Sequence, residues 1–242
     1  MKHQTTVEFQ QITFSRQGET ILRNISGNFK EGTITALIGP SGSGKTTLLK
    51  MLNGLLSPTS GTITILNKRI EEYDPIELRT AVGIALQDAP VIRGTVFENL
   101  ALPYSLKGQT FTKEQAAQFL HYVGLDDSFI HRDASDLSGG QRQRLSLART
   151  LVNEPKILLL DEITSALDPT ATSEVEQLIK KITYEKRVTT VWITHNIGQA
   201  LSLSDNIMLI DSGKVALFAP TNQLTDKDHE ILAPFIHGGA QS

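Results

Sequence analysis

The stretch from Gly39 to Thr46, GPSGSGKT, constrains the fold of this chain more than any other feature of its 242 residues. It follows the β-rich run TITALI and precedes TTLLKMLNGLL, whose apolar residues recur with the spacing of a helix. Glycines let successive backbone N–H groups converge on one point, and the N-terminus of the helix adds its positive end. A strand, such a loop and a helix in that order predict an α/β core that binds the phosphates of a nucleotide.

Two side chains of this loop have expected roles of their own. Lys45 should reach the β- and γ-phosphates, and the hydroxyl of Thr46 should ligate Mg²⁺. The competing interpretation, a glycine-rich turn before a helix, is disfavoured by the correct strand and helix on either side. The expected nucleotide-binding positions are Gly39, Pro40, Ser41, Gly42, Ser43, Gly44, Lys45, Thr46 and Thr47.

Composition and charge narrow the class of protein. With 39% hydrophobic and 20% charged residues, the chain is long enough for one large α/β domain, or for a core carrying a small insertion. A formal net charge of -3 gives no electrostatic reason to expect a nucleic-acid partner. The absence of cysteine excludes disulfides and a catalytic thiol. Neither a signal peptide nor an apolar run of membrane-spanning length is apparent, so we expect a cytosolic chain.

The pattern of strands and helices changes along the chain. Alternating runs over residues 5–38 and the run SGTITILN predict an antiparallel sheet beside a parallel core. The segments TVFENLALPY and TKEQAAQFLHYVGL have helical spacing and indicate a helical insertion, after which strands and helices alternate again. We therefore expect a single domain over 1–242, with a core of about 1–88 and 153–224, a helical subdomain of about 89–152 and a short tail, 225–242.

An aliphatic run that ends in two carboxylates, ILLLDE, covers Ile157 to Glu162. A strand of this kind is buried on both faces, so its C-terminal end places Asp161 at the crevice where α/β sheets bind ligands. Asp161 is the expected holder of Mg²⁺, and Glu162 could polarise the water that attacks the γ-phosphate. The alternative is that the pair only begins a helix, which carboxylates favour.

A second glycine-rich stretch, LSGGQ, covers Leu137 to Gln141 and opens the helical run GQRQRLSLARTL. Taken alone it could be a helix capped by Ser138. In its context it resembles the signature of the ATP-binding subunits of ABC transporters, and the resemblance spans nearly the whole chain. The motifs that carry it stand in the family's order: GPSGSGKTT, ALQD with Gln87, LSGGQ, LLLDE, SALD from Ser165 to Asp168, and WITH ending at His195.

The resemblance implies a fold and a set of partners. The fold is a P-loop NTPase with a RecA-like core, an N-terminal antiparallel β subdomain and an α-helical subdomain inserted before the signature. The activity is hydrolysis of ATP with Mg²⁺. The partners are a second copy of the chain, in an ATP-dependent homodimer with two-fold symmetry, and an integral membrane permease. Through that permease the chain would lie at the cytoplasmic face of the cell membrane.

The resemblance also implies roles for individual residues. In the family, the signature of one copy closes over the γ-phosphate held by the phosphate loop of the other, which explains two phosphate-binding loops in one chain. Gln87 would sense Mg²⁺ and the attacking water, and His195 would contact the γ-phosphate and hold that water with Glu162. Ser165 and Asp168 would lie at the dimer contact. The signature positions carried over are Ser138, Gly139, Gly140 and Gln141.

The sequence departs from the family's pattern at two positions. The aromatic residue that stacks on adenine in the family corresponds to Arg16, whose guanidinium plane can also stack on a base. Phe14 is the other candidate platform. Ile163 stands where many members have proline, which affects neither carboxylate.

Three alternatives remain open at this point. The apolar residues Val91, Ile92, Val96 and Phe97 either form a groove for a helix of the membrane subunit or pack the core of the insertion itself. The chain is either a transport ATPase or a soluble ABC protein without a membrane partner, and the missing coiled coil and tandem cassette favour transport. LLLDEITSALD and TVFENLALPY resemble a bacterial group linked to iron and other metal export, with plant relatives tied to aluminium tolerance, whereas an importer for another solute is the alternative.

Overall fold

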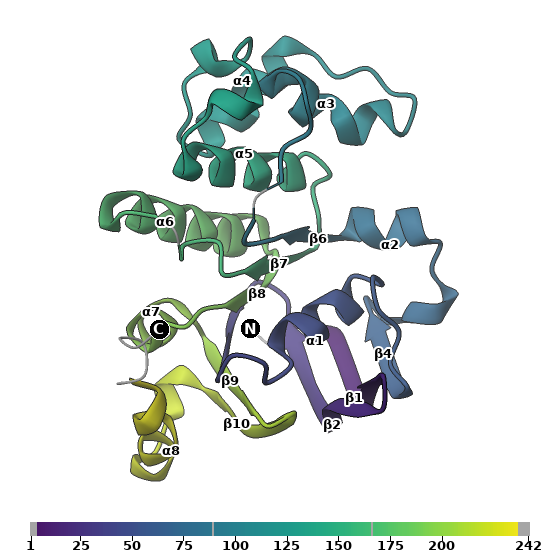
Figure 1. Ribbon diagram of the computed structural model, residues 1–242, viewed down its shortest axis with the longest axis vertical. Helices are drawn as coiled ribbons and strands as arrows, with labels where there is room; N and C mark the ends of the chain where they lie inside the picture. The colour runs from purple at the N-terminus through teal and green to yellow at the C-terminus, as the bar shows by residue number, and fades with distance from the viewer. Residues whose placement is uncertain (1–3, 89, 166, 237–242) are drawn as a thin grey trace.

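The computed structural model describes residues 4–88, 90–165 and 167–236. Ala89, the expected first residue of the insertion, and Ala166, within the SALD motif, lie outside the described residues. Figure 1 shows helices at one end of the molecule, a sheet running through its middle and a second, smaller sheet at one side of its other half. This arrangement confirms the predicted α/β fold class with its antiparallel and helical subdomains.

The central sheet has six strands in the order β10-β9-β3-β8-β7-β6, which are parallel to one another except for β10. Every residue of β3, β7 and β8 is buried, because helices or the second sheet cover both faces. The antiparallel pair β9 and β10 forms a hairpin. The strands are β3 (Ile34–Ile38), β6 (Val82–Ala85), β7 (Ile157–Asp161), β8 (Thr189–Ile193), β9 (Asn206–Asp211) and β10 (Lys214–Pro220).

The second sheet is antiparallel and has the order β2-β1-β4-β5. Its inner face joins the helix α1 (Lys45–Leu52) and one face of the central sheet in a single hydrophobic cluster that includes Phe9, Leu22 and Leu48. The strands are β1 (Thr5–Arg16), β2 (Glu19–Lys30), β4 (Ser60–Ile65) and β5 (Lys68–Arg69). This sheet therefore supports the start of α1, where the phosphate loop ends.

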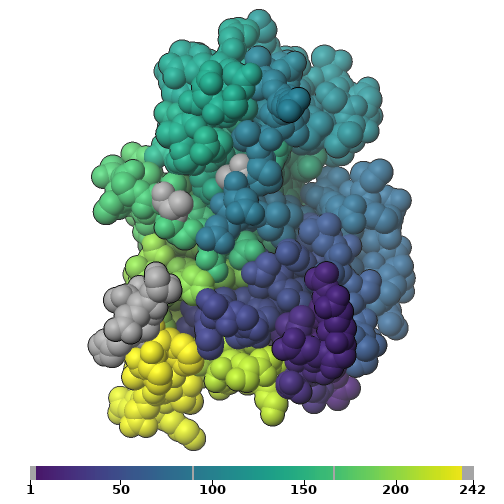
Figure 2. Space-filling view, in the orientation of Figure 1, coloured from purple at the N-terminus to yellow at the C-terminus, as the bar shows by residue number. Residues whose placement is uncertain are grey.

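Three helices form the helical unit, which makes up one end of the molecule in Figure 2. They are α3 (Val96–Ser105), α4 (Lys113–Tyr122) and α5 (Gly139–Leu151). A Ser or Thr begins each of them, and its side chain accepts a hydrogen bond from the third residue of the helix. Their apolar faces share a hydrophobic cluster with α6 (Pro169–Lys186) and with the strands β7 and β8.

Three further helices lie outside the stretches that the sequence patterns mark as helical. The helix α2 (Pro75–Ala81) begins after Asp74, and α7 (Ile197–Leu203) begins after Asn196; both capping side chains accept backbone N–H groups. The expected tail contains α8 (Asp226–Ile236), whose Leu232 is fully buried in a cluster with α7 and β9. Over the described ranges, none of the helices has both the length and the apolar character needed to cross a membrane.

Candidate active site

Three neighbouring strands bring the expected catalytic residues to one edge of the central sheet. Gly39 follows β3, Asp161 ends β7, and His195 lies two residues beyond β8. Asp161 pairs with Ile193 in the register of β7 and β8, so both strands end at the same level. Because parallel strands present their carboxyl ends at one edge, the phosphate loop, the carboxylates and the histidine lie side by side there.

The phosphate loop requires glycine at both of its ends. Gly39 has φ 140° and Gly44 has φ 105°, which are backbone conformations that L-residues with a side chain rarely adopt. A Cβ atom at position 39 would overlap the carbonyl oxygen of Ile210, and one at position 44 would overlap the side chain of Leu22. The close approach of β9 and β2 therefore fixes the path of the loop.

The ammonium group of Lys45 lies within the loop. Its Nζ donates to the carbonyl oxygens of Gly39 and Pro40, both at 2.8 Å. Burial lowers the pKa of Lys45, and the nearby carboxylates of Glu162 and Asp161 oppose this shift. The hydroxyl of Ser43 is buried without a hydrogen-bond partner among the described residues. A desolvated cation and an unused hydroxyl in one loop fit a phosphate group, which can accept from both.

Thr46 and Asp161 supply neighbouring oxygen atoms. The hydroxyl of Thr46 donates to Oδ1 of Asp161 at 3.2 Å, and Asp161 is 7% exposed. Burial raises the pKa of Asp161, while the hydrogen bond from Thr46 opposes that shift. An oxygen-only pair fits Mg²⁺, which takes one or two protein ligands and completes its shell with water and substrate phosphate. No cluster of three His, Cys, Asp or Glu residues suited to a metal occurs in the described ranges.

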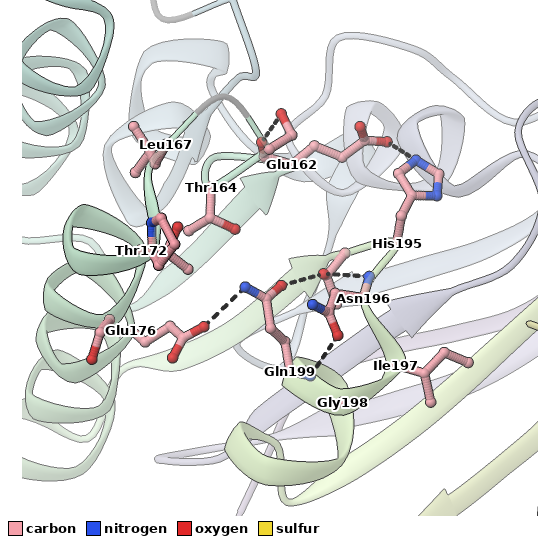
Figure 3. A pocket seen from close by; sticks show the side chains of 14 residues that line it. Glu162, Thr164, Leu167, Thr172, Glu176, His195, Asn196, Ile197, Gly198 and Gln199 are labelled. Atoms are coloured by element: carbon pink, nitrogen blue, oxygen red, sulfur yellow. Dashed lines mark hydrogen bonds and ion pairs between the residues drawn. The ribbon is translucent and has the colours of Figure 1, made fainter. Parts of the chain in front are cut away.

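Glu162 and His195 form a direct pair, which Figure 3 shows at the edge of a cavity. Oε1 of Glu162 lies 2.6 Å from Nε2 of His195. The backbone of Glu162 is left-handed, with φ 52°, and its N–H donates to the carbonyl oxygen of Ile193 at 3.2 Å. The Glu162 side chain reaches the turn that carries His195. The pair presents a carboxylate and an imidazole that together can orient one water molecule.

Ser165 connects the carboxylate strand to Gln87. Its hydroxyl donates to the carbonyl oxygen of Glu162 at 2.9 Å and accepts from Nε2 of Gln87 at 3.3 Å. The helix α5 also reaches this segment, because Nε2 of Gln143 donates to the carbonyl oxygen of Leu86 at 3.4 Å. Gln87 is therefore linked both to the loop after β7 and, through its neighbour, to the helical unit.

The signature lies apart from the phosphate loop of its own chain. Ser138 caps α5, accepting from the N–H of Gln141 at 3.3 Å, while Oε1 of Gln141 accepts from the N–H of Ser138 at 3.0 Å. Gly139 and Gly140 form the first turn of that helix. A cavity of about 420 Å³ is lined by the signature residues Ser138, Gly140 and Gln141 and by Leu167 and Asp168 of the SALD motif, and not by the phosphate loop.

The two positions that depart from the family's pattern differ in exposure. Arg16 is exposed at the end of β1, where it pairs with Glu19 across a hairpin turn. Phe14 is only 9% exposed and packs in the hydrophobic cluster beneath the antiparallel sheet, so little of its ring is free to stack on a base. Ile163 is 2% exposed and belongs to the cluster that α6 shares with the helical unit, so it serves packing.

Some apolar residues after Gln87 pack the core of the helical unit, and one is exposed and could contact a helix of a membrane subunit. Val96 is fully buried in the core of the helical unit, and Val91 and Phe97 pack against it. Ile92 is 37% exposed. Most of this set therefore packs the helical unit itself, and Ile92 is the member that remains available to another protein.

One set of residues near the site escaped sequence reasoning. Thr194, Asn196 and Gln199 line the same cavity of about 700 Å³ as Glu162 and His195. Figure 3 shows Asn196 and Gln199 on the same segment as His195. Glu176, from the helix α6, also lines this cavity. The only local signal was Asn196 with a glutamine three residues later, a pattern typical of a helix start.

Comparison with known proteins agrees with this geometry. The family model described as ABC transporter matches residues 22–165. The chain is 43% identical to the putative ABC transporter ATP-binding protein YjkB of Bacillus subtilis, over 95% of this chain and 92% of that protein. It is 38% identical to the methionine import ATP-binding protein MetN of Clostridium tetani, over 86% of this chain and 67% of that protein. A dimeric structure of the ATP-binding cassette MJ0796 bound to ADP and Pi superposes with a TM-score of 0.81 and 33% identity, covering 90% of this chain and 100% of that one.

Proposed function

The chain belongs to the ABC transporter family and is an ATP-hydrolysing subunit of it, and on this premise we propose that two copies bind ATP between them and drive a separate membrane subunit. The observation that carries the proposal is the pair Glu162 and His195, 2.6 Å apart, at the sheet edge that also holds the phosphate loop. A carboxylate, an imidazole and a buried lysine at one edge are the groups that hydrolysis of a nucleotide phosphate requires.

We infer the following division of work within one copy. Lys45 binds the β- and γ-phosphates, together with the backbone N–H groups of the phosphate loop. Thr46, Asp161 and Gln87 hold Mg²⁺, which when bound neutralises charge on the phosphates. Glu162 accepts a proton from the attacking water, and His195 orients that water and the γ-phosphate. The adenine stacks on the exposed guanidinium of Arg16.

The second half of each site comes from the other copy. The helix start at Ser138, Gly139, Gly140 and Gln141 is a suitable anion-binding site, since its N–H groups and dipole favour negative charge. Its distance from the phosphate loop of its own chain supports a role in the partner's site. The related cassette MJ0796 is a dimer with ADP and Pi bound, which supports the pairing of two copies. ATP then favours the closed dimer, and loss of the γ-phosphate removes that preference.

The membrane partner is a permease, whose conformation changes when the ATP-bound dimer closes. We place its contact near Gln87, where the segment leads from the catalytic loop to the helical unit and where Ile92 is exposed. The chain would then lie on the cytoplasmic face of the cell membrane. We also propose that the chain divides into a core, a helical subdomain over about 89–152 and a short tail.

The cargo that we propose is a metal ion such as iron, moved outward. This proposal rests on the amino-acid sequences of the segments LLLDEITSALD and TVFENLALPY, which resemble those of the bacterial group linked to metal export. The second candidate is import of another solute, because the chain is 38% identical to a protein named for methionine import. Co-purification of the membrane subunit from native membranes separates the two, since its binding cavity should be lined by metal-ligating side chains for the first and should lack them for the second.

The composite site is tested with Glu162→Gln. This variant keeps the shape of the side chain but cannot accept the proton, so ATP should remain bound and a dimer should accumulate on size exclusion. Glu185→Gln, the same change at an exposed position near the end of α6, is the matched control and should dissociate normally after turnover. A Glu162→Gln protein that stays monomeric in saturating ATP would contradict the composite site.

A further inference from the structure

The turn that carries His195 is held on both sides by hydrogen bonds. The N–H of Asn196 donates to the hydroxyl oxygen of Thr194 at 3.1 Å, and the side-chain oxygen of Asn196 accepts from the N–H of Gln199 at 3.1 Å. Thr194 is 4% exposed and follows the buried strand β8. The residue before the histidine and the residue after it are therefore fixed relative to each other (Figure 3).

The network continues from this turn to the helix α6. The hydroxyl of Thr194 donates to Oε1 of Gln199 at 2.8 Å, and Nε2 of Gln199 donates to Oε1 of Glu176 at 2.9 Å. Glu176 lies in the middle of α6, which packs on the hydrophobic core through Val175, Leu178 and Ile179. The turn is thus anchored to a helix that the core already holds in place.

The direction of each hydrogen bond restricts which side chains can complete the network. The hydroxyl of Thr194 accepts from Asn196, so its single proton is free to go to Gln199. The Gln199 amide then presents its N–H₂ to Glu176, whose carboxylate can only accept. A carboxylate at position 199 would face the carboxylate of Glu176, and no donor would remain between them.

We propose that Gln199 and Glu176 are positioning residues for hydrolysis, which hold the His195 turn so that Nε2 meets the carboxylate of Glu162. Capping of α7 needs only Asn196, so it does not account for the links to Thr194 and Glu176. This inference rests on the proposed function, since it assumes that Glu162 and His195 perform the hydrolysis. Neither Gln199 nor Glu176 touches the reacting atoms in this proposal; they act through the orientation of the imidazole.

The test exchanges the amide and the carboxylate. Gln199→Glu should lower kcat for ATP about tenfold and change KM less than about twofold, because phosphate binding does not depend on the turn. In the double variant Glu176→Gln with Gln199→Glu, the new amide can donate to the new carboxylate. The kcat of the double variant should therefore return to within about twofold of that of Glu176→Gln alone.

Matched controls separate this effect from charge and from folding. Gln177→Glu makes the same amide-to-carboxylate change as Gln199→Glu, but at the exposed residue that follows Glu176 on α6, and it should leave kcat unchanged. Thermal unfolding of each variant measures the fraction of folded protein, and kcat is calculated per folded molecule. Should Gln199→Glu fail to fold, Gln199→Met removes both side-chain hydrogen bonds of Gln199, to Thr194 and to Glu176, without adding a charge, and should again lower kcat, by about threefold or more.

Two outcomes would overturn the inference, and a third concerns its premise. An unchanged kcat in both Gln199 variants, or a double variant as slow as Gln199→Glu, contradicts a positioning role. Glu162→Gln and His195→Ala are measured in parallel. If these two variants keep the wild-type rate, the proposed catalytic assignment itself has failed; if they lose activity while Gln199→Glu does not, only the positioning role is wrong.

Discussion

Replacing Lys45 with methionine should weaken ATP binding at least about a hundredfold while leaving the stability of the fold nearly unchanged. The lysine is 5% exposed, and burial lowers its pKa, so the folded protein bears a desolvation cost for this charge. The lowered pKa means that this cost is present below that pKa and disappears as the pH rises toward the ordinary lysine range. Methionine has a similar length and no charge, so it removes the desolvation cost but also loses the two hydrogen bonds to the carbonyl oxygens of Gly39 and Pro40. These two effects oppose each other, so the nucleotide-free variant should unfold near the wild-type temperature.

The size of the binding defect follows from the hydrogen bonds that the ammonium makes. Nζ makes two hydrogen bonds to carbonyl oxygens in this structure, and a phosphate can accept the same number. Hydrogen bonds to charged groups contribute about 1.5–3 kcal/mol each, so the variant should lose about 3–6 kcal/mol of binding free energy. This corresponds to an increase in Kd of about a hundredfold to ten-thousandfold.

Thermal unfolding with and without ATP measures this difference. At an ATP concentration of about 100 times the wild-type Kd, ligand binding should stabilise the wild-type protein by about 2.7 kcal/mol. For a chain of this length that raises the Tm by about 5–10 °C. The same ATP concentration should raise the Tm of Lys45→Met by less than about 2 °C. Lys113→Met, an exposed lysine at the start of α4, is the control and should respond like the wild type.

A Lys45→Met protein that ATP stabilises as strongly as the wild type would refute the assignment of this lysine to the phosphates. A variant that is already unfolded without ATP would refute the expectation that removal of the buried charge leaves the nucleotide-free protein stable. The two results are independent, because one concerns the nucleotide and the other the charge in the empty fold.

Three further changes test other parts of the site. Glu162→Gln should reduce steady-state ATP hydrolysis at least about a hundredfold, measured by phosphate release, and wild-type turnover would exclude Glu162 as the base. Asp161→Asn should raise the Tm without nucleotide at neutral pH, because burial raises the pKa of this carboxyl; the gain should shrink as the pH falls toward the ordinary Asp range, and a gain that persists at low pH contradicts this origin. Arg16→Ala should weaken ATP binding about threefold to tenfold in a titration with a fluorescent nucleotide, and an unchanged Kd would exclude stacking on its guanidinium.

The parts of the fold that the sequence predicted are those with local causes. The phosphate loop could be recognised because its glycines have backbone angles that other residues avoid, as Gly39 and Gly44 show. The strand before Asp161 was recognisable because a run of aliphatic residues buried on both faces has no polar alternation. The fold class and the ATPase family followed from the order of these motifs along the chain.

The parts that the sequence did not predict depend on contacts between distant segments. Gln199 and Glu176 are 23 residues apart on different helices, and no periodicity relates one to the other. The helix α7 has only seven residues, too few for a clear apolar pattern, so its start at Asn196 gave the only local signal. The burial of Phe14 likewise depends on which face of β1 the core covers, which strand pairing decides.

The reciprocal cap at the start of α5 has a thermodynamic consequence for the meeting of two copies. Ser138 and Gln141 satisfy each other's backbone N–H groups within a single chain, so this turn is already rigid before any encounter. Association then carries no additional loss of chain entropy at that point, and a larger share of the contact energy remains for affinity. Gln141→Ala removes only the bond from the Ser138 N–H to the Gln141 side chain, and it should therefore appear as slower association of the protomers before it appears as a change in their chemistry.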